Sequence, residues 1–130
     1  MESANNTDWI SGTIHFGGSW PDNTSTGGTY DSGVINFADH LHVYAVEWEP
    51  DEIRWYVDGV QFFAATPDDV SGEWVFDHPF FIIMNVAVGG NWPGNPDHET
   101  IFPQAILVDY VRVYQSSSTA ERLHCTFTND

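Results

Sequence analysis

The sequence predicts an all-β fold, a sandwich or jelly roll of antiparallel strands. Short runs of aromatic and β-branched residues recur along the chain, long loops rich in Gly, Pro, Asn and Asp separate them, and no stretch shows a helical period. The 130 residues are 42% apolar and 15% aromatic, enough to bury one hydrophobic core. We therefore expect one domain.

The first candidate strand is TIHFGG, from Thr13 to Gly18, and it contains His15. The next stretch, from Gly17 to Gly33, is rich in Gly, Asn and Asp, which favours a long loop. This expected loop carries Trp20 next to Pro21.

The stretch from Leu41 to Ala65 contains aromatic and β-branched runs that are interrupted at Glu49-Pro50-Asp51 and again at Asp58-Gly59. Pro cannot continue a strand ladder, and Asp-Gly supplies the positive φ angles of a tight hairpin turn. The pattern therefore predicts consecutive antiparallel strands. Between the two breaks, apolar residues starting at Ile53 alternate with more polar ones, so we expect one buried face and one partly wet face.

A further apolar run, from Phe80 to Gly90, lacks clean alternation, which is typical of a central strand covered on both sides. Gly89 to Phe102 predicts a second long loop, and Ala105 to Gln115 predicts another strand. Residues 116–130 are polar and without pattern, which indicates a linker or a disordered tail.

The charge balance is strongly acidic, with 19 Asp and Glu residues against three Arg and a formal net charge of −16. Such a field repels phosphate backbones and anionic lipid, so nucleic-acid and membrane-surface binding are disfavoured. The single cysteine, Cys125, excludes an intrachain disulfide and a Cys-based metal site. No apolar run is long enough to span a bilayer and no signal-peptide pattern is present, so we expect a protein that stays inside the cell or has its signal upstream of this chain.

Two tryptophans, Trp20 and Trp92, lie in the expected loops. Exposed Trp rings flanked by Asn, Asp and Gly suit sugars, because the apolar face of a pyranose stacks on indole while amides and carboxylates bond its hydroxyl groups. The alternative is that these rings close over the core as loop plugs.

The histidines and carboxylates are less specific. His15 suits either a structural histidine or a substrate contact. His40 and His42 would share one face of a strand and could hold a metal, but the sequence offers no third obvious ligand. Asp109 lies in an otherwise apolar run, where a carboxylate needs a partner, so it is expected to bind a cation or to pair with a backbone or Arg group.

Four stretches occur in a specific order and spacing: IHFGGSWPDNTSTGG, HVYAVEWEPDEIRWYVDGV, HPFFIIMNVAVGGNWPG and VDYVRVYQ. Together they resemble glycoside hydrolase family sixteen, and within it the laminarinase-like endo-β-1,3-glucanases. The resemblance covers roughly Met1 to Gln115. It implies a concanavalin A-like jelly-roll β-sandwich of antiparallel strands.

The resemblance also implies that the chain is part of a longer domain. The family motif E-I-D-I-M-E is followed by a residue such as Ser or Met, and this chain begins M-E-S. Glu2 then corresponds to the general acid/base, and the nucleophilic Glu is expected upstream of Met1. Residues 1–115 are thus expected to be the C-terminal half of a catalytic domain whose N-terminal half is missing, which leaves the sandwich incomplete.

By the same resemblance, the substrate contacts lie on the concave sheet and its loops: His15, Trp20, Asn85, Asn91 and Trp92. Trp48 and Trp55 are expected to be packing residues, with a cleft position as the alternative for Trp48. Asp109 corresponds to a position that binds a structural calcium ion in many members, while no cofactor is expected for catalysis.

The implied activity is hydrolysis of internal β-1,3-glucosidic bonds in laminarin-type glucans by a retaining two-carboxylate mechanism, with the isolated chain inactive without its nucleophile. Mixed-linkage glucan and marine galactans are the alternative substrates. Two other functions stay open: a non-catalytic β-glucan-binding module, and a subunit whose open strand edges pair with the missing half or with a second chain. The resemblance implies an extracellular protein that binds β-glucan and neither nucleic acid nor membrane.

Overall fold

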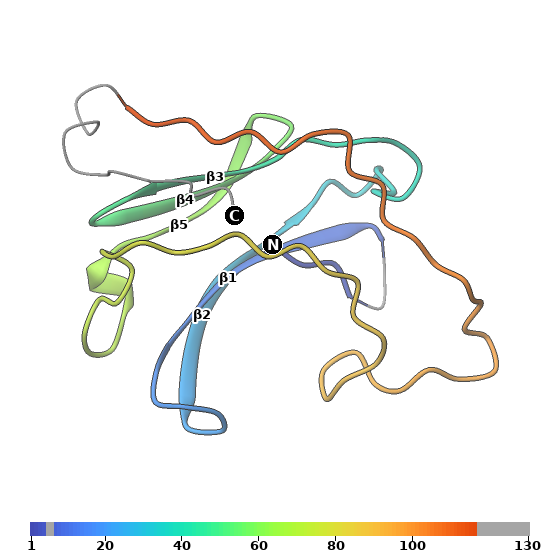
Figure 1. Ribbon diagram of the computed structural model, residues 1–130, viewed down its shortest axis with the longest axis horizontal. Helices are drawn as coiled ribbons and strands as arrows, with labels where there is room; N and C mark the ends of the chain where they lie inside the picture. The colour runs from blue at the N-terminus through green and yellow to red at the C-terminus, as the bar shows by residue number, and fades with distance from the viewer. Residues whose placement is uncertain (5–6, 117–130) are drawn as a thin grey trace, which may run out of the picture.

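The computed structural model describes residues 1–4 and 7–116 and is built from antiparallel strands. β1 (Trp9–Gly17) and β2 (Asn23–Asp31) form one hairpin, and β3 (Tyr44–Glu49), β4 (Glu52–Val57) and β5 (Val60–Ala65) form a three-stranded sheet in that order (Figure 1). Within the described residues, helix is limited to one 3-10 turn, η1 (Pro67–Asp69). None of their helices is long and apolar enough to cross a membrane. The all-β antiparallel class is confirmed.

The three-stranded sheet follows the turn signals in the sequence. Asp58 and Gly59 join β4 to β5, and both have positive φ, 49° and 81°, as a two-residue hairpin turn requires. In β4 the side chains of Ile53, Trp55 and Val57 are buried while their neighbours are partly exposed. The predicted strands and the predicted buried face are therefore confirmed.

β2 lies within the segment from Gly17 to Gly33 that was expected to be a loop, so that expectation was wrong. The strand pairs with β1 along its whole length. Its glycines allow close packing: a Cβ on Gly28 would lie only 2.8 Å from the ring of Phe63. This segment is a strand because of its pairing with β1, since Gly and Asn disfavour strands by themselves.

The core lies between the even-numbered face of β1 and the buried face of β4. Six buried residues form the first cluster and three form the second: Ile14, Phe16, Ile53, Trp55, Ala65 and Val70, then Ile10, Phe37 and Val57. A β-bulge in β5 places Phe62 between the partners of Trp55 and Tyr56. Both Phe62 and Phe63 pack against the core as a result.

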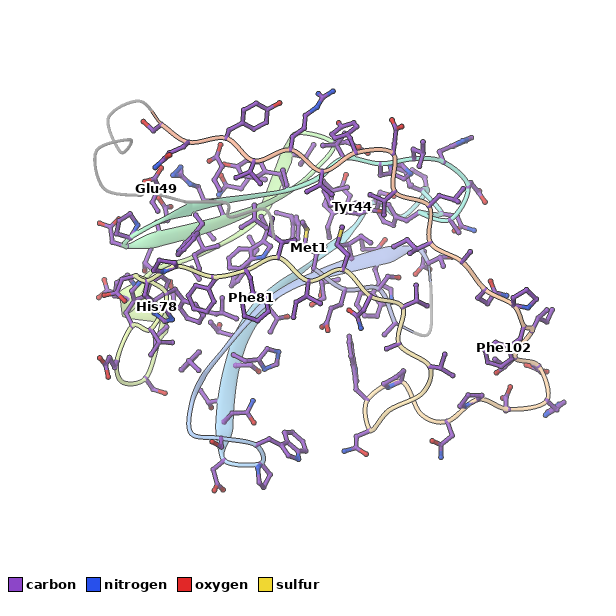
Figure 2. All side chains as sticks on the ribbon, in the orientation of Figure 1. Met1, Tyr44, Glu49, His78, Phe81 and Phe102 are labelled. Carbon is purple, nitrogen blue, oxygen red and sulfur yellow. The ribbon has the colours of Figure 1, made fainter. Side chains whose placement is uncertain are left out.

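The strands expected at Phe80–Gly90 and Ala105–Gln115 are not formed, so both predictions were wrong. The large apolar residues from Phe80 to Val88 are between 52% and 82% exposed. The chain from Asp77 to Ser116 instead runs as an extended trace past the two sheets, with Phe102 on its outermost loop (Figures 1 and 2). A strand persists only where a neighbouring strand pairs with its backbone, and no described strand does so here.

Candidate functional site

The hairpin of β1 and β2 has one buried face and one polar face. The odd-numbered residues of β1 turn away from the core: Trp9, Ser11, Thr13 and His15. Across the hairpin they stand opposite residues of β2: Asp31, Thr29, Gly27 and Ser25. The hydroxyl groups of Ser11 and Thr13 lie 3.1 Å apart and form a hydrogen bond. This face can therefore offer hydroxyl, imidazole and aromatic groups to a ligand.

Glu2 joins this face through the backbone. Its N–H donates to the carbonyl of Ser11 at 2.9 Å, and the N–H of Ser11 donates back at 2.8 Å, which makes an antiparallel bridge beside β1. Directly opposite residues of an antiparallel pair point to the same side of the sheet. The Glu2 side chain consequently lies on the polar face, on the side of β1 away from β2.

A pocket of about 350 Å³ lies over this part of the sheet, lined by Met1, Glu2, Thr13, His15, Ile83 and Asn85. It unites three of the residues expected in the site, Glu2, His15 and Asn85. Figure 2 shows Met1 near the centre of the molecule, beside the extended segment that carries Phe81. Segments far apart in the sequence thus meet at one opening.

Three pocket residues were missed by the sequence reasoning: Met1, which directly precedes Glu2, Thr13 and Ile83. Thr13 lies two positions before His15 in the same strand, so the period of two would have placed it on the same face. No local signal singles out Ile83, because it reaches the pocket only through the path of the extended segment.

The other expected sugar contacts do not line this pocket. Trp92 lies in a turn closed by the bond from the N–H of Gly94 to the carbonyl of Gly90, at 2.9 Å. Its ring packs on Trp9, with ring centres 5.9 Å apart and planes tilted by 54°. Trp20 lies in the turn between β1 and β2 and is 75% exposed, and Asn91 is also exposed. Neither Trp20 nor Trp92 belongs to the described core, which speaks against the loop-plug interpretation.

The tryptophans expected to pack behave differently from one another. Trp55 is buried in the core and its ring lies 5.0 Å from that of Phe63. Trp48 is 40% exposed, and its indole N–H donates to the carbonyl of Phe76. Trp55 is therefore a packing residue, as expected, while Trp48 is only partly covered.

The candidate metal ligands do not converge. Asp109 lies in the exposed extended segment, outside any strand. The described residues contain no group of three or more His, Cys, Asp or Glu side chains arranged to hold a metal. Calcium requires six to eight oxygen ligands, so the residues described do not complete a calcium site around Asp109, and its role as a ligand stays a prediction. His42 binds the carboxylate of Asp58 instead of sharing a metal with His40.

A second pocket, of about 330 Å³, is lined by Asp8, Asp31, Gly33, Val34, Ile35 and Asn36. Two of its polar side chains, those of Asp31 and Asn36, have partners in local turns. Asp31 accepts the N–H of Gly33 at 2.7 Å, and Asn36 accepts the N–H of Ala38 at 3.0 Å. Such bonds are typical of turn residues, so this pocket is explained by loop geometry.

Comparisons with known proteins identify the family of the chain and relatives with the same fold. Residues 3–112 match the family description Glycosyl hydrolases family 16. The chain is 48% identical over 118 residues to glucan endo-1,3-beta-glucosidase A1 of Niallia circulans, which covers 82% of this chain and 17% of that protein.

The chain is also similar to solved structures, including the following two. The endo-beta-1,3-glucanase of Pyrococcus furiosus has a TM-score of 0.63 and 44% identity, over 76% of this chain and 39% of that one. The laminarinase catalytic domain of Thermotoga maritima MSB8 has a TM-score of 0.65 and 43% identity, over 76% of this chain and 41% of that one. The chain thus spans less than half of each relative, and the predicted jelly-roll class is confirmed. Because the family description covers residues 3–112 and these relatives share more than two fifths of the aligned residues, the chain belongs to glycosyl hydrolase family 16.

Proposed function

We propose that the chain carries the acid/base side of the cleft of a retaining endo-β-1,3-glucanase, with Glu2 as the general acid/base. The observation that carries this proposal is the pocket shared by Glu2, His15 and Asn85. The names of the similar proteins support the substrate, since they are a glucan endo-1,3-beta-glucosidase, an endo-beta-1,3-glucanase and a laminarinase.

Each group has a defined task in this proposal. The Glu2 carboxyl gives its proton to the leaving glycosidic oxygen and later takes a proton from the attacking water. A retaining enzyme needs a second carboxylate about 5–5.5 Å away as the nucleophile. Glu2 is the only carboxylate among the pocket residues, so the nucleophile must come from outside the described site. His15 and Asn85 bond to sugar hydroxyl groups and hold the ring in place.

The expected substrate is laminarin-type β-1,3-glucan, with mixed-linkage β-glucan as the next candidate. Because a polymeric glucan lies outside the cell, we expect an extracellular protein. No step of the reaction is assigned to a calcium ion.

The test compares this chain with a chimera in which the N-terminal half of the laminarinase catalytic domain of Thermotoga maritima MSB8 precedes Met1. We expect reducing-sugar release from laminarin by the chimera and none by the chain alone. Glu2→Gln in the chimera should abolish the release and preserve laminarin binding. A folded chimera without activity would overturn the hydrolytic proposal.

The second candidate function is a non-catalytic β-glucan-binding module. It is favoured because the pocket contains one carboxylate, whereas a retaining enzyme needs two. It predicts laminarin binding by the chain alone and by the chimera, with no sugar released by either. The two functions therefore differ in one measurement on the chimera.

A further inference from the structure

The polar face of β1 continues past the pocket to a pair of tryptophans. Trp9 is half-buried at the start of β1, whereas Trp92 is 57% exposed on the loop above it. Their ring centres lie 5.9 Å apart, within the range of a favourable aromatic pair. A large apolar ring is therefore held open to solvent beside the hydroxyl-bearing face.

The position of this pair relative to Glu2 follows from the strand register. Glu2 bridges Ser11, so Trp9 and Thr13 are its two diagonal neighbours across the bridge. Diagonal neighbours in an antiparallel pair lie about 7–8 Å apart. Thr13 lines the pocket together with His15 and Asn85. Glu2, which itself lines the pocket, thus has Thr13 and His15 on one side along β1 and the tryptophan pair on the other.

Trp92 meets the hairpin through its ring contact with Trp9. It belongs to the glycine-rich turn from Gly90 to Gly94, which pairs with no described strand. Within the described part of the chain, the ring of Trp9 is the one aromatic partner of Trp92. Trp9 itself is fixed, because it lies in β1 and pairs with Asp31 of β2.

We propose that Trp9 is a positioning residue that holds the ring of Trp92 over the cleft face, where Trp92 stacks on a glucosyl ring on the opposite side of Glu2 from His15 and Asn85. This inference rests on the proposed function, in which the resemblance already implies Trp92 as a substrate contact, and deepens it by assigning the placing of that ring to Trp9. The apolar face of a pyranose packs on the indole, as an aromatic platform permits. The two sugar positions then hold neighbouring rings on either side of the bond at Glu2.

The experiment is calorimetric titration of the full chain with laminarihexaose. We expect Trp92→Ala and Trp9→Ala each to weaken binding by about 5- to 150-fold, the range of one aromatic stacking contact. The double variant Trp9→Ala/Trp92→Ala should bind no more weakly than Trp92→Ala alone, because Trp9 acts through Trp92. Trp9→Phe keeps a ring in place and should restore most of the affinity.

Trp20→Ala serves as the matched control. It removes another exposed tryptophan that has no ring contact with Trp9, so its effect should add to that of Trp9→Ala. If Trp9→Ala disturbs the hairpin, judged by circular dichroism, the comparison of Trp9→Phe with Trp9→Leu carries the test, since only Phe supplies a ring.

Three results would overturn the inference. Equal affinity of Trp9→Ala and the wild type would remove Trp9 from the site. The proposal that the chain binds glucan would be unaffected by that result. Fully additive losses in the double variant would mean that Trp9 acts independently of Trp92. Absence of laminarihexaose binding by the wild-type chain would overturn both this inference and the glucan specificity proposed above.

Discussion

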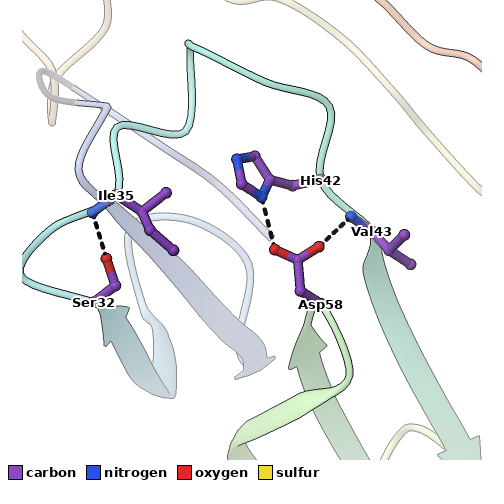
Figure 3. Close-up of polar contacts among 5 residues, drawn as sticks. All are labelled: Ser32, Ile35, His42, Val43 and Asp58. Atoms are coloured by element: carbon purple, nitrogen blue, oxygen red, sulfur yellow. Dashed lines mark hydrogen bonds and ion pairs between the residues drawn. The ribbon is translucent and has the colours of Figure 1, made fainter.

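The carboxylate of Asp58 binds the imidazole of His42, with Oδ2 and Nδ1 2.7 Å apart (Figure 3). Its other oxygen accepts the N–H of Val43 at 2.9 Å, and the N–H of Asp58 donates to the carbonyl of Val43 at 2.9 Å. One residue therefore makes the turn between β4 and β5 and also fixes the chain that enters β3. The ring of His42 packs in turn on Phe37 of the core, with ring centres 5.1 Å apart.

Replacing Asp58 should lower the free energy of unfolding to an extent that depends on whether the new residue tolerates the turn and keeps a side-chain bond. Asp58→Ala removes both side-chain bonds and places Ala at a φ of 49°, so we expect a loss of about 2–4 kcal/mol in the free energy of unfolding. Asp58→Asn tolerates the same φ and keeps an oxygen for Val43, so it should lose only about 1 kcal/mol. Urea unfolding of the three proteins measures the difference. Equal stability of the Ala and Asn variants would contradict this account.

The stability of the chain should depend on acid pH through two carboxylates. The hydrogen bond from His42, and then that from the Val43 N–H, lower the pKa of Asp58 below its ordinary value of 3.8. Bonds from the N–H and the hydroxyl group of Thr66 likewise lower the pKa of Asp69. The folded pKa lies below the unfolded one, so this stabilisation is complete above the unfolded value and is lost as the pH falls through the folded value.

We therefore expect the urea midpoint to fall on acidification below about pH 4. Asp58→Asn and Asp69→Asn should each make that fall shallower, because each removes one such carboxylate. An unchanged acid limb in both variants would show that other groups control it.

Two neighbouring glycines of β2 should respond unequally to alanine. A Cβ on Gly27 would lie 2.6 Å from the backbone carbonyl oxygen of Gly12, whereas a Cβ on Gly28 would meet the Phe63 side chain at 2.8 Å. A side chain can yield more easily than a backbone, so Gly27→Ala should cost more, about 3 kcal/mol against about 1–2 kcal/mol for Gly28→Ala. Thermal unfolding of both variants measures the order, and the reverse order would contradict the predicted close packing of the hairpin.

His15→Ala should weaken laminarin binding and leave stability almost unchanged. His15 lines the pocket and is exposed, so its loss removes a polar contact to sugar without opening the core. We expect a loss of about 1 kcal/mol in binding free energy. His98→Ala is the matched control, since its side chain is 89% exposed and lies outside the pocket. Equal affinity in the two variants would remove His15 from the site.

The apolar run from Phe80 to Val88 should bind a hydrophobic dye such as ANS. Exposed contiguous apolar surface of this kind is typical of sites that bind other surfaces or aggregate. Phe81 is 82% exposed, so Phe81→Ser should reduce dye fluorescence without lowering the urea midpoint. A large loss of stability in that variant would mean that Phe81 is packed in solution.

Part of the candidate site was predictable from the sequence because its residues belong to recognisable motifs. Glu2, His15 and Asn85 occupy motif positions, and the three line one pocket. Thr13 was also predictable, because residues two positions apart in a strand share a face and Thr13 lies two positions before His15. Trp9 was not, because its importance comes from a ring contact with Trp92, 83 positions later in the chain.

The strands β3, β4 and β5 were predictable from the sequence, because an Asp-Gly turn and the alternation from Ile53 to Val57 are local signals. Two other segments depend on pairing with distant parts of the chain, which local signals do not reveal. Asn23–Asp31 is a strand because β1 pairs with it, although its glycines indicate a loop. Phe80–Gly90 has the composition of a buried strand and forms none among the described residues, because strand structure depends on hydrogen bonds from a neighbouring strand and composition cannot supply that neighbour.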